Sequence, residues 1–247
     1  MEDNGRKKIL VINGSPHREK STTMVATRAF VAGMASVGDY AEETVNVSDL
    51  RITPCLGCLS CWGRTEGECV IKNDDIPALR DKIRASDVLI GSFPLYFFGM
   101  PGQMKVMCDR LLSLMNTYTG QTCPPGGPAH GFRFPKEGQK FVAVSACAYA
   151  ETDAVYKPVI DQFDLIFGHE NYTALFCPQL KTAVDKGGSR TERIKDRFFA
   201  AGAEFARTGT LSAETSTSAT RAPFSREIYK TILAGVWERE REEGRKS

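Results

Sequence analysis

The sequence has no long hydrophobic run, no marked excess of charge of either sign and no apolar leader. No stretch approaches the ~18 uninterrupted apolar residues of a membrane-spanning helix, and the opening MEDNGRKK lacks the apolar region of a signal peptide. Lys plus Arg number 32 and Asp plus Glu number 30, so the net charge of +2 gives no field that favours nucleic acid or an anionic membrane. We therefore expect a cytoplasmic protein with no nucleic-acid and no membrane partner.

The composition also excludes a disordered or collagen-like chain. Of the 247 residues, 42% are hydrophobic, which is enough to build a large domain with a real core. A cytoplasmic setting disfavours disulfides. The eight Cys are therefore expected as thiols, metal ligands or redox groups.

Short apolar runs alternate with helix-length segments along the chain. Strands are predicted at residues 9–12, 88–90, 141–144 and 172–176, with an alternating edge strand at 43–47. Helices are predicted at residues 21–36, from 76 onward, and at 102–115, 152–167 and 189–207. This order predicts an α/β fold with a doubly wound parallel sheet, a class that binds ligands beyond the carboxyl ends of its strands.

Three segments interrupt this alternation, at residues 54–69 and 116–138 and in a tail from Leu211. We expect one domain over residues 1–209, with a Cys-rich insertion at 54–69, and a linker with a C-terminal helical arm over 210–247. A helix predicted over 226–240 would carry one apolar face, formed by Ile228, Ile232, Val236 and Trp237. Such a face is typical of a helix that packs on a neighbouring subunit or on its own domain.

A loop of small hydroxyl residues joins the first strand to a helix N-terminus, over residues 13–23. Its N–H groups and hydroxyls surround one point, as a phosphate requires; the alternative is a polar turn whose Ser only caps the helix. A Walker A loop fits poorly, because Glu19 stands at its second Gly and Pro16 removes a backbone donor. No strand ending in Asp follows to hold magnesium, so nucleotide hydrolysis is a remote alternative.

The GSP sequence followed by Ser and Thr resembles the phosphate loop of the flavodoxin-like NAD(P)H-dependent FMN reductases. The resemblance implies a five-stranded sheet of order 2-1-3-4-5 with helices on both faces. It also implies that Ser15, Ser21 and Thr22 hold the FMN phosphate, with Thr23 adjacent. His17 stands where the family usually has Arg. The compensating charge would then come from His17, Arg18 or Lys20, or chiefly from the helix dipole.

Three consecutive aromatic residues follow the third strand. Tyr96, Phe97 and Phe98 cannot all face the core from one strand, because side chains alternate; either some of them line a cleft or the loop buries them beneath the next helix. The segment resembles the family's flavin-ring loop, which is followed by Lys-x-x-x-Asp-Arg. The resemblance places along the flavin Pro94, Leu95, Tyr96, Phe97, Phe98 and Gly99, with Ser145 as a weaker contact. Lys105, Asp109 and Arg110 are expected to anchor the following helix through ion pairs.

Four Cys form the pattern CxxCxxCx7C, at Cys55, Cys58, Cys61 and Cys69. Such thiolates suit tetrahedral zinc or an iron-sulfur cluster, and three close Cys plus a remote one favour the cubane. The motif resembles that of the iron-sulfur flavoprotein branch of the same family, which implies a 4Fe-4S cluster. Plain thiols, a redox-active pair of Cys and zinc remain alternatives. The remaining four are expected to be packing residues: Cys108, Cys123, Cys147 and Cys177.

Together these motifs imply an FMN-dependent NAD(P)H oxidoreductase. Electrons would pass from the nicotinamide through FMN, and through the cluster if present, to a quinone, a small molecule or a protein acceptor. Hydride transfer needs no side-chain acid or base, so no catalytic residue is assigned. A homodimer or homotetramer is expected. The alternative is a flavodoxin-type electron carrier with no NAD(P)H activity of its own, although the net charge does not suggest a strongly charged docking face.

Overall fold

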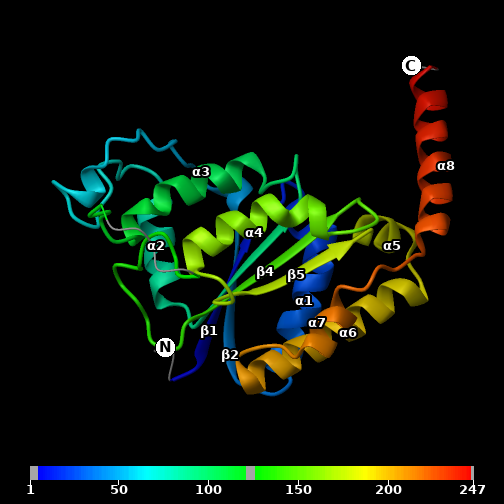
Figure 1. Cartoon of the computed structure of the whole chain (residues 1–247), viewed down its shortest axis with the longest axis horizontal. Coiled ribbons are helices and arrows are strands. Elements are labelled where there is room, and N and C mark those ends of the chain that lie inside the picture. The colour runs from blue at the N-terminus through cyan, green and yellow to red at the C-terminus, as the bar shows by residue number, and fades with distance from the viewer. Residues whose placement is uncertain (1–4, 121–125, 246–247) are drawn as a thin grey trace.

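The computed structural model describes residues 5–120 and 126–245 and contains a five-stranded parallel sheet with helices on both faces (Figure 1). The strand order is β2-β1-β3-β4-β5. The strands are β1 (Lys7–Asn13), β2 (Tyr40–Asn46), β3 (Val88–Pro94), β4 (Lys140–Cys147) and β5 (Thr173–Pro178). The predicted fold class and strand order are therefore confirmed.

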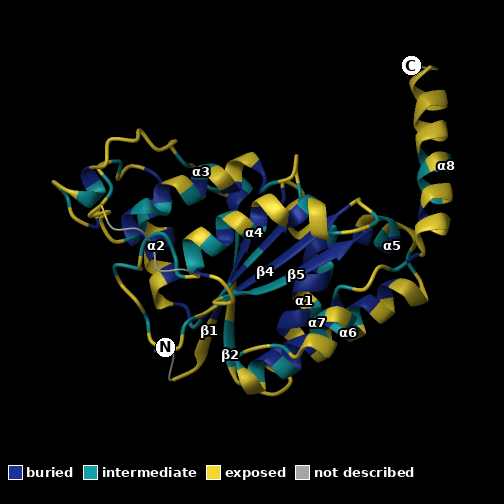
Figure 2. Ribbon diagram, viewed as in Figure 1, coloured by how far each residue is buried: buried dark blue, intermediate teal, exposed yellow. Residues whose placement is uncertain are grey.

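The central strand β1 is apolar on both faces because both faces are covered. Ile9 and Val11 pack into the core on one side of the sheet, and Leu10 and Ile12 into the core on the other. All four side chains are buried, and Figure 2 shows dark blue over the inner strands of the sheet, in contrast to the edge strand β2. A strand that is buried on both faces consists of consecutive apolar residues, which is why this strand could be predicted from the sequence.

Two helical layers supply these cores. One contains α1 (Thr22–Ala35), α5 (Leu180–Lys186), α6 (Ser189–Thr208) and α7 (Ala213–Ala219). The other contains α2 (Ile76–Ala85), α3 (Gly102–Arg110) and α4 (Asp153–Phe167). Helices α1 and α6 cross in close contact: a Cβ added at Gly202 would lie 1.8 Å from the backbone oxygen of Phe30. The glycine is therefore required by packing.

The structure differs from the prediction at three helices, one of which, α5, was not predicted at all. The helix predicted to reach residue 115 ends at Arg110, and a 3-10 turn (Leu111–Leu114) replaces its last part. The segment expected to be a linker contains α7, whose first amides are capped: the Ser212 hydroxyl accepts a hydrogen bond from Thr215 N at 3.2 Å. Ala219 at its end is buried in the core, so this segment packs on the domain.

The predicted C-terminal helix is confirmed as α8 (Arg226–Gly244), which is anchored only at its start. Phe224 and Tyr229 belong to the core, and the Tyr229 hydroxyl donates to the carbonyl of Ala148 at 2.7 Å. Beyond Leu233 the helix extends away from the domain (Figure 1). Its second half leaves the apolar side chain of Trp237 exposed.

The two other insertions contain little regular structure. The Cys-rich segment has one short 3-10 turn (Ser60–Trp62), and residue Cys123 of the second insertion lies outside the described residues. Within the described ranges, none of the helices combines the length and hydrophobicity needed to cross a bilayer.

We expect two C-terminal truncations to have very different effects on the free energy of unfolding. Ending the chain after Leu233 removes only exposed or half-buried residues and should change the free energy of unfolding by less than about 0.5 kcal/mol. Deleting residues 213–247 also removes Ala219, Phe224 and Tyr229 from the core and should cost at least about 5 kcal/mol. Urea denaturation measures both. Equal stabilities would contradict the assignment of this segment to the core.

Candidate functional site

The loop after β1 is held by its own side chains and by β3. The Asn13 amide donates to Asn46 Oδ1 at 2.9 Å, and its Oδ1 accepts the Ser15 N–H at 3.1 Å. Gly14 N donates to the carbonyl of Ser92 at 2.8 Å. A Cβ on Gly14 would lie 2.5 Å from the sulfur of Met104, so a larger residue here would have to displace the Met104 side chain.

The N-terminus of α1 offers unused hydrogen-bond donors to this loop. The side chain of Ser21, the N-cap residue, makes no capping hydrogen bond, and the first amides of a helix have no intrahelical acceptor. The Thr23 hydroxyl is buried and has no partner among the described residues. A buried orphan hydroxyl beside free amides is the arrangement that an anion would satisfy. The residues present therefore fit a phosphate.

Most ionic side chains of the loop are engaged elsewhere. Arg18 lies 2.6 Å from Asp49, and Glu19 pairs with Arg28, so the carboxylate that argued against a Walker A loop is neutralised. His17 and Lys20 are exposed. The positive end of the α1 dipole thus remains as the fixed source of charge at this point.

The aromatic residues after β3 form a tight turn that projects into solvent. Tyr96 and Gly99 exchange two backbone hydrogen bonds of 3.0 Å each, and Phe97 and Phe98 between them adopt left-handed φ angles of 47° and 65°. Asn and Gly are the residues that ordinarily occupy such positions. Each Phe there costs roughly 1–2 kcal/mol of backbone strain.

This strain holds aromatic surface in the open. Phe97 is 98% exposed, and Tyr96 and Phe98 are exposed as well. The ring of Phe98 lies 5.8 Å from that of Tyr149, which follows β4. The three aromatics are therefore not buried beneath the next helix, whereas Leu95 is half-buried and donates its N–H to the carbonyl of Ala146 at 2.8 Å. The turn supplies an apolar wall at the carboxyl edge of the sheet.

Ser145 is fully buried, and its hydroxyl is used inside the protein. It donates to the carbonyl of Phe93 at 2.7 Å and accepts the Tyr156 hydroxyl at 2.9 Å. Burial raises the pKa of Tyr156, so this phenol stays protonated and keeps donating. This geometry does not favour the flavin contact that the resemblance implied for Ser145.

The four clustered Cys line one small hollow of about 20 Å³. Burial, followed by the neighbouring Cys69, Cys55 and Cys58, raises the pKa of the Cys61 thiol. A hydrogen bond with the Ser60 side chain lowers the pKa of the Cys58 thiol. Among the residues that the structure describes, no three Cys, His, Asp or Glu side chains are set to hold a single metal ion.

An eight-atom cubane is larger than this hollow, so the test is whether the thiols can separate. The backbone of residues 54–58 makes no hydrogen bond to the rest of the described domain, which leaves Cys55 and Cys58 on a loop free to open. Four thiols with no competing ligand type are the donor set of an iron-sulfur cluster. The four Cys therefore have the chemistry of cluster ligands. The loop that carries Cys55 and Cys58 would have to open for a cluster to fit between them.

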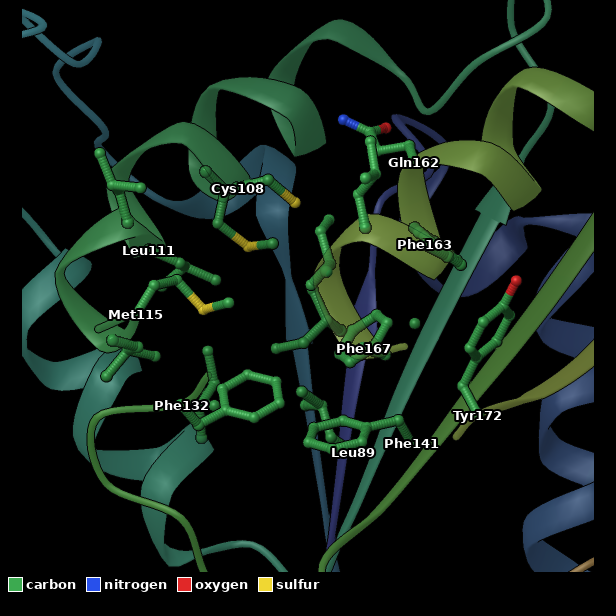
Figure 3. A pocket seen from close by; sticks show the side chains of 18 of the residues that line it. Leu89, Cys108, Leu111, Met115, Phe132, Phe141, Gln162, Phe163, Phe167 and Tyr172 are labelled. Atoms are coloured by element: carbon green, nitrogen blue, oxygen red, sulfur yellow. The ribbon is translucent and has the colours of Figure 1, made fainter. Parts of the chain in front are cut away.

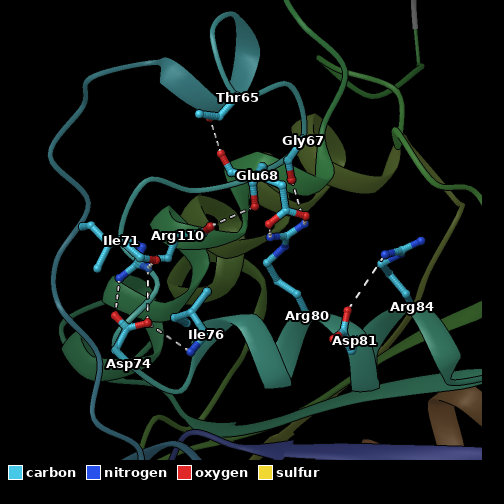
Figure 4. A network of polar contacts seen from close by, with 11 residues as sticks. Thr65, Gly67, Glu68, Ile71, Asp74, Ile76, Arg80, Asp81, Arg84 and Arg110 are labelled. Carbon is cyan, nitrogen blue, oxygen red and sulfur yellow. Dashed lines mark hydrogen bonds and ion pairs between the residues drawn. The ribbon is translucent and has the colours of Figure 1, made fainter.

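Arg110 at the end of α3 fastens both flanks of the Cys-rich insertion (Figure 4). Its guanidinium is buried and pairs with Asp74 at 2.5 Å, and it donates to the carbonyls of Thr53 at 2.5 Å and Ile71 at 3.0 Å. Although burial disfavours the cation, hydrogen bonds to Asp74 and Cys69 raise the pKa of Arg110. With the Lys105–Asp109 pair on the same helix, the predicted anchoring role is confirmed.

A second, larger cavity of about 680 Å³ lies between the sheet and helices α3 and α4 (Figure 3). Sequence reasoning missed it entirely. Its lining consists of apolar positions scattered from Ile12 to Tyr172 that read individually as ordinary core residues. No motif marks a cavity that only the packing of distant segments creates.

A family model described as a flavodoxin-like fold matches residues 7–168. The chain belongs to this family. An iron-sulfur flavoprotein of Methanocaldococcus jannaschii is 35% identical to this flavodoxin-like chain over 103 residues, 42% of this chain and 51% of that protein. An FMN-dependent NADH:quinone oxidoreductase of Pseudomonas fluorescens is 24% identical over 137 residues, 51% of this chain and 66% of that protein.

The solved structures agree on the fold. An NAD(P)H:quinone oxidoreductase from Methanothermobacter marburgensis aligns with a TM-score of 0.58 at 16% identity, covering 82% of this chain and 98% of that one. The match to the archaeal iron-sulfur flavoprotein spans about half of that relative's length. Its activity, like that of the other relatives, therefore bears on this flavodoxin-like protein as a proposal.

We expect Asp74→Asn to loosen the Cys-rich insertion. The variant leaves Arg110 buried without its countercharge, which should cost about 3 kcal/mol at neutral pH, whereas Asp81→Asn at an exposed site should cost less than about 0.5. Although burial opposes it, hydrogen bonds from Arg110 and from the N–H groups of Thr53 and Ile76 lower the pKa of Asp74 below 3.8.

The stability from this pair is present above pH ~4 and is lost as the pH falls through the lowered pKa. The difference between wild type and Asp74→Asn should therefore shrink on acidification. Urea titrations at pH 7 and pH 3 measure it, and a difference that grows towards pH 3 would contradict the role of the pair.

Proposed function

We propose that this protein binds FMN and oxidises NAD(P)H, passing the electrons to a small-molecule acceptor such as a quinone. The observation that carries the proposal is the orphan Thr23 hydroxyl beside the uncapped first turn of α1, next to an exposed aromatic turn. An anionic tail and a flat ring, joined in one ligand, satisfy both features. Relatives named as FMN-dependent NADH:quinone oxidoreductases support this reading.

The chain's own residues would bind and orient the flavin. The hydroxyls of Ser15, Ser21, Thr22 and Thr23 and the first amides of α1 would hold the phosphate, with His17 at the rim. The ring would lie along Pro94, Leu95, Tyr96, Phe97, Phe98 and Gly99. Once bound, FMN supplies the chemistry, by accepting a hydride from the nicotinamide and returning electrons to the acceptor. Because the aromatic turn is already formed, its side chains would not have to become ordered each time a flavin binds.

A flavodoxin-type carrier is the competing function. It would hold FMN in the same loops but would not consume NAD(P)H in the steady state. The aromatic turn favours the enzyme, because an exposed and strained apolar wall suits a second planar molecule stacked near the flavin better than a polar docking face does. Continuous NAD(P)H oxidation with a soluble quinone separates the two functions.

We further propose that Cys55, Cys58, Cys61 and Cys69 ligate a 4Fe-4S cluster. Support comes from the four thiols around one hollow, the free backbone of residues 54–58 and the relatives named iron-sulfur flavoproteins. The buried Arg110 beside Cys69 would offset part of the negative charge of four thiolates. Such a cluster would give the protein a one-electron exit towards its acceptor.

We also propose that the protein works as a homodimer or homotetramer. The second half of α8 carries the exposed Trp237 and the half-buried Val236, yet contacts little of its own domain (Figure 1). An isolated helix of this length is marginal in water, so it needs a surface to pack on. The chain that ends after Leu233 tests this by sedimentation, because it should form smaller species than the full chain.

Ser21→Asp should weaken FMN binding at least tenfold while preserving the fold. Aspartate is a good N-cap residue, so the helix is retained, but its charge opposes the phosphate. The control is Ser189→Asp, at the first residue of α6. Bound flavin after purification and the rate of NAD(P)H oxidation should fall together in the Ser21 variant only. Full flavin content in that variant would refute the phosphate site.

Cys58→Ala should remove the iron from anaerobically purified protein, whereas Cys108→Ala should retain it. We expect about four iron atoms per chain in the wild type and a broad absorption that underlies the flavin bands. Iron analysis and visible spectroscopy measure both. Zinc in place of iron, or iron unchanged in the Cys58 variant, would contradict the cluster.

A further inference from the structure

The cavity beneath α3 and α4 is lined mainly by hydrocarbon. Side chains from α3, α4 and the sheet face one another across it, among them Cys108, Phe163, Leu89 and Phe141 (Figure 3). At about 680 Å³ it falls within the ~300–1,000 Å³ typical of ligand pockets. Protein interiors are otherwise packed with few voids larger than a water molecule. A partly open space of this size can admit a small molecule from solvent.

Water is a poor occupant, because an ordered water needs two to four polar partners. The polar groups of the lining already have partners. Tyr172 donates its hydroxyl to Asp164 at 2.9 Å, and the Gln139 amide donates to the carbonyls of Ile83 and Ser86. The exceptions are the Gln162 amide and the His130 imidazole, which make no hydrogen bond to the described residues; the His130 ring only contacts the rings of Trp62 and Tyr118. Two hydrogen-bonding side chains are thus free in a mainly apolar space.

The charged side chains of the lining, Arg84 and Asp109, also have partners of opposite charge. Arg84 lies over the ring of Phe134 at 4.2 Å and 3.9 Å from Asp81. Asp109 is paired with Lys105. No uncompensated charge among the described lining residues faces the cavity, so a charged ligand would lose its hydration without gaining a counterion.

We propose that this cavity is a binding site for a neutral, mainly hydrocarbon small molecule with one hydrogen-bonding group, which the amide of Gln162 recognises. The site is separate from the loops at the carboxyl edge of the sheet. It adjoins the Cys-rich insertion, because Cys55 and Gly57 line both this cavity and the hollow of the four thiols. A bound molecule therefore touches the loop that carries these Cys. The proposal does not depend on flavin binding.

The test is a titration of the purified full-length protein with N-phenyl-1-naphthylamine, a neutral aromatic amine that fluoresces in apolar surroundings. We expect saturable binding at one site per chain. Decan-1-ol should displace the probe at least tenfold more effectively than decanoate at pH 8, because the two differ in charge and share the hydrocarbon chain. Absence of saturable binding, or equal displacement by both, would overturn the proposal.

Two variants that fill the cavity locate the probe. Ala129→Phe and Cys108→Phe each place a ring in the lining and should weaken probe binding at least tenfold, whereas Ala234→Phe on the exposed side of α8 should leave it unchanged. Circular dichroism identifies the variants that fold. The displacement experiment uses the wild-type protein, so it tests the proposal even if a variant fails to fold. Unchanged probe affinity in a folded cavity variant would place the probe elsewhere and contradict the site.

Discussion

The parallel pairing of β1 with β3 is the constraint on which the candidate flavin site depends. Asn13 pairs with Ser92 at the carboxyl ends of the two strands, and the next residue, Gly14, donates its N–H to the Ser92 carbonyl. Since both chains leave the sheet here, the hydroxyl-rich loop and the aromatic turn must emerge side by side. An anion site and an apolar wall are thereby brought within the span of one molecule.

Helix α3 connects this edge to the Cys-rich insertion. It begins just after the aromatic turn and extends about 13 Å to Arg110, whose buried guanidinium fastens the two flanks of the insertion through Thr53 and Ile71. The wall of the large cavity is built from the same helix. A single rigid element therefore fixes the relative positions of the phosphate loop, the flanks of the Cys-rich insertion and the cavity.

The sequence was sufficient for the features that rest on local patterns. Strands such as β1 are apolar on both faces, and the loop 13–23 carries its chemistry in consecutive residues, so both were predictable. Local patterns did not reveal the surroundings of Ser145. Its place at a strand end suggested a ligand contact, but its hydroxyl is hydrogen-bonded to the Phe93 carbonyl and the Tyr156 hydroxyl. Helix α7 was missed because its Ser/Thr/Ala sequence has weak periodicity, and tertiary packing of Ala219 decides its structure. The cavity depends on segments far apart in sequence, which no local pattern reports.

The central claim is that α1 and its preceding loop bind a phosphorylated flavin through the phosphate. Comparing FMN with riboflavin, which has the same ring and no phosphate, tests this most directly by quenching of flavin fluorescence on the apoprotein. The account predicts that FMN binds at least a hundredfold more tightly, which corresponds to about 2.7 kcal/mol. Equal affinities for the two flavins would contradict it.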